Sequence, residues 1–177
     1  KAVMLASLRS LVPKDWSGAH EVAWSWLWEN VERMLKVNLG KPAVNQKALN
    51  KLIMGFDSST RATIRREQYS AFFELAPAGQ EHFKQSATRL DFIADQIIAL
   101  TMDMYKDPVK LVTDLSAIGL RHVGYGIPPE LFGPFVSASV KVIGDFTEDE
   151  TAKEAYRWSL GLMSRILMRV ISEGSTI

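Results

Sequence analysis

The stretch LSAIGLRHVGYGIPPELFGPF, from Leu115 to Phe135, carries the features that decide how this chain folds. Leu111, Leu115 and Ile118 recur at three- and four-residue steps. His122 continues this row at the next four-residue step, just before two glycines and a double proline. The spacing predicts an amphipathic helix whose last turn directs His122 inward. An inward histidine is either a core residue bonded to a neighbouring carbonyl or a metal ligand, and spacing alone leaves both open.

The composition is that of an ordinary folded domain, and it excludes several classes of function. The 177 residues are 47% apolar and 23% charged, which is enough to bury one sizeable core. The formal charge of +1 gives no reason to expect nucleic acid as a partner. No apolar run is long enough to span a membrane, and no signal peptide opens the chain. The absence of cysteine excludes disulfides and thiolate chemistry and is compatible with a cytoplasmic location.

Apolar periodicity and helix-ending residues predict an all-α protein. Asp107 followed by Pro108 is typical of an N-cap and the first helical position. The sequence TEDE, from Thr147 to Glu150, has the pattern of a capping box. No segment alternates apolar and polar residues as a strand does. The predicted helices span residues 2–12, 17–37, 43–56, 59–75, 78–83, 87–106, 109–121, 129–143 and 148–172.

Motifs for hydrolysis, nucleophilic catalysis and nucleotide binding are missing. The sequence has no GxSxG elbow, no HExxH pair and no glycine-rich phosphate loop. A chain that performs chemistry with these residues would need a cofactor.

The segment from Leu115 to Trp158 resembles the helix F to helix H region of a globin. Its pattern is a leucine-periodic helix, a basic residue, a histidine and a short turn, followed by a helix that opens with aromatic residues and ends in GD. In globins, the histidine at this place is the proximal ligand of haem iron. The resemblance implies a three-over-three globin fold that holds haem b, iron protoporphyrin IX, with His122 as the one metal ligand from the protein. The other histidines, His20 and His82, are expected to face solvent.

The segment YSAFFELAPAGQEHF is similar to the helix B and CD-corner segment of bacterial globins. By position, Tyr69 is the distal tyrosine and Phe83 the haem-stacking phenylalanine, with the bacterial spacing and no gap. Ile93 takes the distal place where many globins have histidine or glutamine, and a three-residue shift would put Leu90 there. Both are aliphatic, so the resemblance implies a pocket without a distal histidine, in which Tyr69 donates to bound dioxygen. The remaining residues that the resemblance assigns to the haem pocket are Phe73, Ile97, Ile118, Ile127, Phe132 and Phe135.

Residues 1–40 precede the globin-like domain, which is predicted to span residues 41–177. This leading segment resembles the end of helix G, the corner and helix H of another globin. Within the leading segment, three stretches correspond to stretches near the end of the globin-like domain. They are ASLRSL (residues 6–11) with ASVKVI (138–143), KDWS (14–17) with GDFT (144–147), and AWSW (23–26) with AYRW (155–158). The repeat predicts either a segment from a chain of tandem globins or a globin with an extra leading helical hairpin. We expect its apolar surface to dock on a neighbouring globin domain or across a homodimer.

The resemblance implies reversible binding of dioxygen or another diatomic gas, for transport, storage or sensing. Two other functions stay open. One is haem redox chemistry, such as nitric oxide dioxygenation with a separate reductase; the other is a gas-sensor module of a larger signalling protein. A globin fold that has lost haem is disfavoured, because His122 and Phe83 both stand at matching places. The chain is not expected to be an enzyme by itself.

Overall fold

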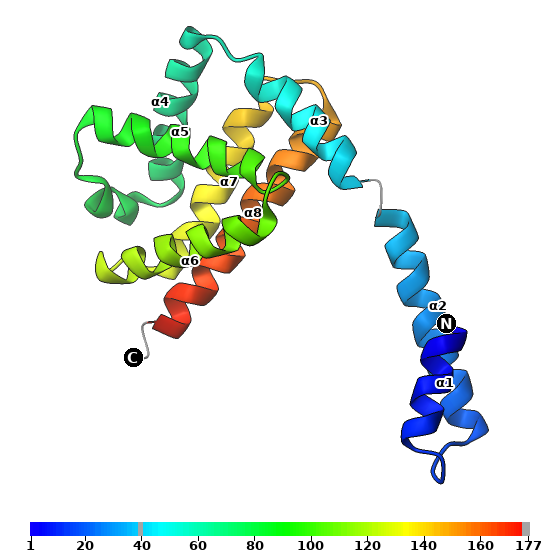
Figure 1. Ribbon diagram of the computed structural model, residues 1–177. Coiled ribbons are helices and arrows are strands. Elements are labelled where there is room, and N and C mark those ends of the chain that lie inside the picture. The colour runs from blue at the N-terminus through cyan, green and yellow to red at the C-terminus, as the bar shows by residue number, and fades with distance from the viewer. Residues whose placement is uncertain (39–40, 175–177) are drawn as a thin grey trace. The chain divides into compact units, whose positions relative to one another are not determined.

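The computed structural model describes residues 1–38 and 41–174, and every regular element in these ranges is a helix (Figure 1). The prediction of an all-α protein is therefore confirmed for the described part of the chain. The chain divides into two compact units, Lys1–Pro42 and Ala43–Ile177. Over the same described ranges, none of the helices is long and apolar enough to cross a membrane.

The first unit is a helical hairpin. Helix α1 (Ala2–Leu11) and helix α2 (Gly18–Asn38) lie side by side (Figure 1). An ion pair between Lys1 and Glu29 joins the two helices. Leu5 is buried in α1, but most of the other large apolar side chains are exposed or only half-buried. The hairpin by itself thus encloses very little core.

The second unit holds the larger core. Its elements are α3 (Lys41–Met54), α4 (Ser58–Leu75), the 3-10 helix η1 (Pro77–Phe83), α5 (Ala87–Asp103), α6 (Pro108–Gly124), the 3-10 turn η2 (Pro129–Leu131), α7 (Phe132–Gly144) and α8 (Glu150–Gly174). Helix α4 packs on α7, α6 packs on α8, and α7 packs on α8 (Figure 1). Ile64 of α4, Leu115 of α6 and Tyr156 of α8 are among the fully buried residues. Three helices far apart in the sequence therefore meet in one core.

The start of α6 has the predicted N-cap. The carboxylate of Asp107 accepts a hydrogen bond from the backbone N–H of Lys110 at 2.9 Å, with Pro108 in the first helical position. Helix α6 continues to Gly124 instead of ending at residue 121, because the backbone N–H of Tyr125 still reaches the carbonyl of Arg121. The histidine therefore lies inside the helix and not at its final residue.

The start of α8 differs from the predicted capping box. Helix α8 begins at Glu150, and the carboxylate of Asp149 accepts from the backbone N–H groups of Thr151 and Ala152. The hydroxyl of Thr147 accepts from the N–H of Asp149 at 3.1 Å and does not reach the helix. The capping-box interpretation is wrong, because an aspartate adjacent to the helix already occupies the cap position.

Most of the other helix bounds also differ from the prediction by one or two residues, and two larger differences have a local cause. Helix α5 ends at Asp103 and not at residue 106, because residues 104–106 form a turn before the next N-cap. The predicted helix 129–143 is divided into η2 and α7. Pro134 lies in the first turn of α7, and its ring would clash with the carbonyl of residue 130 in a continuous α-helix.

Candidate functional site

His122 lies in the last turn of α6 and is half-buried. Its Nδ1 atom lies 2.8 Å from the backbone carbonyl oxygen of Ile118, one turn back in the same helix. Because a carbonyl oxygen only accepts, Nδ1 carries the proton and donates it, which leaves the lone pair of the neutral ring on Nε2. This bond fits both interpretations of His122, the core residue and the metal ligand. The groups around the ring are needed to distinguish a core histidine from a metal ligand.

The turn after α6 holds His122 in place. The backbone N–H groups of Tyr125 and Ile127 both donate to the carbonyl of His122, at 3.2 and 3.1 Å. Gly126, between them, has a φ of 64°, a left-handed conformation that glycine adopts without strain. The ring centroids of Tyr125 and Phe132 lie 6.4 and 5.7 Å from that of the imidazole. The imidazole therefore has aromatic neighbours from the turn and from α7.

Aromatic rings from α4, η1 and α7 form a second group. The ring centroid of Phe83, at the end of η1, lies 5.5 Å from that of Tyr69 and 5.9 Å from that of Phe73. Phe72 contacts both Phe83, at 5.6 Å, and Phe135 of α7, at 5.3 Å. These contacts are tilted or edge-to-face, the geometry that aromatic rings prefer. The structure thus brings together four of the predicted pocket residues, and Phe72 contacts three of them, Phe73, Phe83 and Phe135.

Phe72 and Gly79 are the residues of this region that the sequence did not single out. Phe72 is fully buried, and Gly79 of η1 is also buried. A Cβ atom on Gly79 would lie 2.6 Å from the Cζ atom of Phe72. Only glycine therefore lets η1 pass this close to the ring. The available signal was a glycine placed between Pro77, which starts η1, and the aromatic residue that ends it.

Tyr69 is buried, and its hydroxyl proton is already in use. The hydroxyl donates to the backbone carbonyl of Leu90 at 2.8 Å, which joins α4 to the first turn of α5. Burial, with a smaller contribution from the carboxylate of Asp91, raises the pKa of Tyr69 above its usual range, so the phenol stays neutral. A phenol has one proton. Tyr69 can therefore donate to a ligand only after it releases Leu90.

The apolar stripe of α5 divides into two rows. Ala94 and Ile98 are buried in the core, whereas Ile93 and Ile97 are half-buried. Leu90 is also half-buried and lies on the same helix face as Ile93 and Ile97, three and seven residues away. The two residues proposed for the distal place, Leu90 and Ile93, therefore share one side of the helix.

The predicted pocket residues share an intermediate exposure. Among them only Tyr69 is buried, with 7% of its surface exposed, and none is in the exposed class. Phe132 and Phe135, one turn apart at the start of α7, contact the imidazole and the aromatic group respectively. Helix α7 therefore contributes to both groups. The half-buried residues are Phe73, Phe83, Leu90, Ile93, Ile97, Ile118, His122, Ile127, Phe132 and Phe135.

The other two histidines lie in different surroundings. His20 is exposed and stacks on Trp16 with a centroid distance of 5.8 Å, so its predicted exposure is confirmed. His82 is half-buried, and the prediction that it faces solvent is wrong in this respect. In a 3-10 helix, residues three apart lie above one another, so His82 shares its side of η1 with the buried Gly79.

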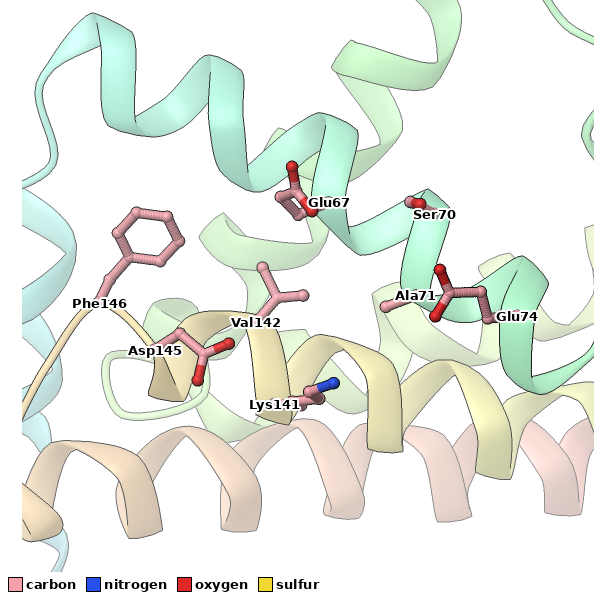
Figure 2. A pocket seen from close by; sticks show the side chains of 8 residues that line it. All are labelled: Glu67, Ser70, Ala71, Glu74, Lys141, Val142, Asp145 and Phe146. Atoms are coloured by element: carbon pink, nitrogen blue, oxygen red, sulfur yellow. The ribbon is translucent and has the colours of Figure 1, made fainter.

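A separate cavity of about 300 Å³ lies between α4 and α7 (Figure 2). Figure 2 shows Glu67 and Glu74 on α4, Lys141 on α7 and Asp145 directly after α7 around it. Three carboxylates and one ammonium group are typical of a solvated junction between helices. The predicted pocket residues do not line this cavity. Its lining is Glu67, Ser70, Ala71, Glu74, Lys141, Val142, Asp145 and Phe146.

Neither a known protein-family model nor a curated protein sequence matches this chain. The globin resemblance therefore stays a prediction, and a proposed function has to explain the geometry around His122.

Proposed function

We propose that the second unit is a three-over-three globin that holds haem b with His122 as the iron ligand and reversibly binds dioxygen or another diatomic gas. The orientation of His122 carries this proposal. Its Nδ1–H donates to the carbonyl of Ile118 at 2.8 Å, so Nε2 is the atom available to the metal. Metal-binding histidines are held in this way, because the bond at one nitrogen fixes the tautomer and the ring orientation.

The residues around His122 also fit haem. Haem is a flat, largely apolar group, and it needs apolar side chains on both of its faces. The isoleucines and phenylalanines that the resemblance assigns to the pocket on α5, α6 and α7 supply such surfaces and are only half-buried. Moving one of these side chains from half to full burial is worth about 1 kcal/mol. Covering this set of side chains therefore gives a favourable contribution to haem binding.

Haem, when bound, would supply an iron centre that can take a diatomic gas. For the distal wall of the pocket the resemblance assigns Ile93 or Leu90, which neither coordinate iron nor donate a hydrogen bond. Their side chains would exclude water and leave room for a small apolar gas. Tyr69 is the side-chain donor assigned to this wall, with its proton on the carbonyl of Leu90. This arrangement favours reversible gas binding over ligation by a second protein side chain.

Haem titration of the purified chain tests the proposal. We expect binding of about one haem per chain, with a Soret band and a ferrous spectrum typical of one axial histidine. His122→Ala is expected to lose stable haem retention. His20→Ala and His82→Ala are the matched controls, because neither histidine lies in α6, and both should retain haem. A His122→Ala variant with the wild-type stoichiometry and spectrum would contradict the proposal.

A further inference from the structure

The helix pairs α1–α2 and α7–α8 can be compared position by position. The alignment of AWSW with AYRW pairs Ala23 with Ala155, and the alignment of ASLRSL with ASVKVI pairs Ala6 with Ala138, both at a separation of 132 residues (155 − 23 and 138 − 6). The corner segments KDWS and GDFT are two residues out of this register. The same separation aligns the first residue of α2 with the first residue of α8, so the second helices of the two pairs correspond in their starts as well as in sequence.

The burial of the aligned positions is opposite in the two pairs. Six positions that are 0–1% exposed in α7 and α8 have exposed counterparts in α1 and α2, and at five of them both residues are small or aliphatic. Three of the five hold the same small residue in both pairs, and small residues allow another helix to approach closely. The pairs, with the buried residue first, are Ala138–Ala6, Ser139–Ser7, Ile143–Leu11, Ala155–Ala23 and Ser159–Leu27.

In the second unit, the structure shows what covers these positions. Helix α4 packs on α7, and α6 packs on α8. The buried Ser139 accepts a hydrogen bond from the side-chain amide of Gln68 on α4 at 2.9 Å. Its counterpart Ser7 donates to the carbonyl of Val3 in its own helix. The described residues of the first unit therefore repeat the packing positions of α7–α8, and within this unit no further helix covers them.

The hairpin also exposes more apolar surface than a small isolated element tolerates. Leu11 is 76% exposed and Leu27 is 39% exposed, and both stand at positions whose counterparts in α7 and α8 are buried. Large apolar side chains at such positions favour a docking face over a solvated one.

We propose that α1–α2 is the closing helix pair of a further globin unit and that its exposed face docks a helical unit equivalent to α3–α6 of this chain. In the second unit, α3–α6 come before α7–α8 in the sequence. The same order puts the partner unit in the same polypeptide, on the amino-terminal side of Lys1. A helix equivalent to α4 then packs on Ala6 and Ser7, and one equivalent to α6 packs on α2. The inference rests on packing positions and holds whether or not haem binds.

A fusion protein tests this inference. Residues 43–132 are placed directly before Lys1 of the full chain, because Lys1 aligns with the position after Phe132. Amide hydrogen exchange is then measured in α1 and α2, with α7 and α8 of the same molecule as the internal reference. We expect amide exchange in α1 and α2 to slow at least tenfold relative to the unfused chain. Amide hydrogens exchange when a helix opens locally, and a docked helix opens less often.

Two lysine substitutions in α2 sharpen the test. Ala23→Lys in the fusion is expected to restore fast exchange, because its counterpart Ala155 is buried. Val22→Lys is the matched control, since its counterpart Glu154 is exposed, and the slow exchange should persist.

Two results would overturn the inference. One is unchanged exchange of α1 and α2 in the fusion while α7 and α8 stay protected. The other is a dimer of the unfused chain, seen by sedimentation, that dissociates on Ala23→Lys, because the face would then belong to a second copy.

Discussion

The helix pairs α1–α2 and α7–α8 have related sequences and opposite surroundings. Trp24 of α2 aligns with Tyr156 of α8, yet Trp24 is half-buried and Tyr156 is fully buried. Leu11 is 76% exposed, whereas the aligned Ile143 is 1% exposed. A row of apolar residues thus specifies a helix pair, but the helices packed over the pair decide whether it forms a core. The same substitution made at two aligned positions, one in each helix pair, measures how much the covering helices contribute to the free energy of unfolding.

The largest difference is expected at the pair Ile143 and Leu11. Ile143→Ala removes a fully buried side chain and should lower the free energy of unfolding by about 2–5 kcal/mol. Leu11→Ala removes an exposed side chain and should change it by less than about 0.5 kcal/mol. Urea denaturation of both full-length variants makes the comparison. Equal losses would mean that the hairpin also has a filled core.

A smaller difference is expected at the aligned serines. Ser139→Ala leaves the buried amide of Gln68 without its partner and should cost about 1–3 kcal/mol of unfolding free energy. Ser7→Ala removes an exposed hydroxyl and should cost less than about 0.5 kcal/mol. The same denaturation experiment applies. A neutral Ser139→Ala would show that the contact of α7 with α4 does not depend on this bond.

Tyr69 extends the comparison to α4, the helix that packs on α7 within the second unit. Tyr69→Phe removes the bond to Leu90 and should lower the free energy of unfolding by about 1 kcal/mol. A hydrogen bond from Tyr69 to dioxygen would replace the bond to Leu90. The free energy gained at dioxygen is therefore largely offset by the free energy lost at Leu90. We therefore expect dioxygen dissociation, measured by stopped flow, to accelerate by less than about threefold. An acceleration of tenfold or more would mean that the phenol leaves Leu90 at little cost.

The smallest effect is expected from removing the hairpin. The second unit has its own α7–α8 pair and its own core, so deletion of residues 1–42 should leave haem affinity within about twofold of the full chain. Haem titration and circular dichroism of the truncated protein measure this. Loss of haem together with loss of helicity would make the hairpin part of the same core.

The sequence was sufficient for local features and insufficient for contacts between helices. The row ending in His122 and the Asp107 cap depend on neighbours within one turn, and both are found in the structure. The cap of α8 was assigned to Thr147 and not to Asp149, because both residues suit a helix start and only geometry separates them.

Contacts over longer distances in the chain could not be predicted. The bond from Tyr69 to Leu90 depends on how α4 and α5 cross. The close approach of Gly79 to Phe72 depends on the path of η1. The exposure of Leu11 depends on which helices pack over it, and aligned sequences cannot report that.

The most direct test of the central claim is the ferrous absorption spectrum of His122→Gly with and without added imidazole. Glycine removes the ring and its bond to Ile118 and leaves space for a free imidazole beside the iron. We expect His122→Gly to lose the wild-type spectrum and to recover it with imidazole, while His82→Gly keeps that spectrum with or without imidazole. A His122→Gly protein that shows the wild-type ferrous spectrum without imidazole would contradict the assignment of His122 as the haem ligand.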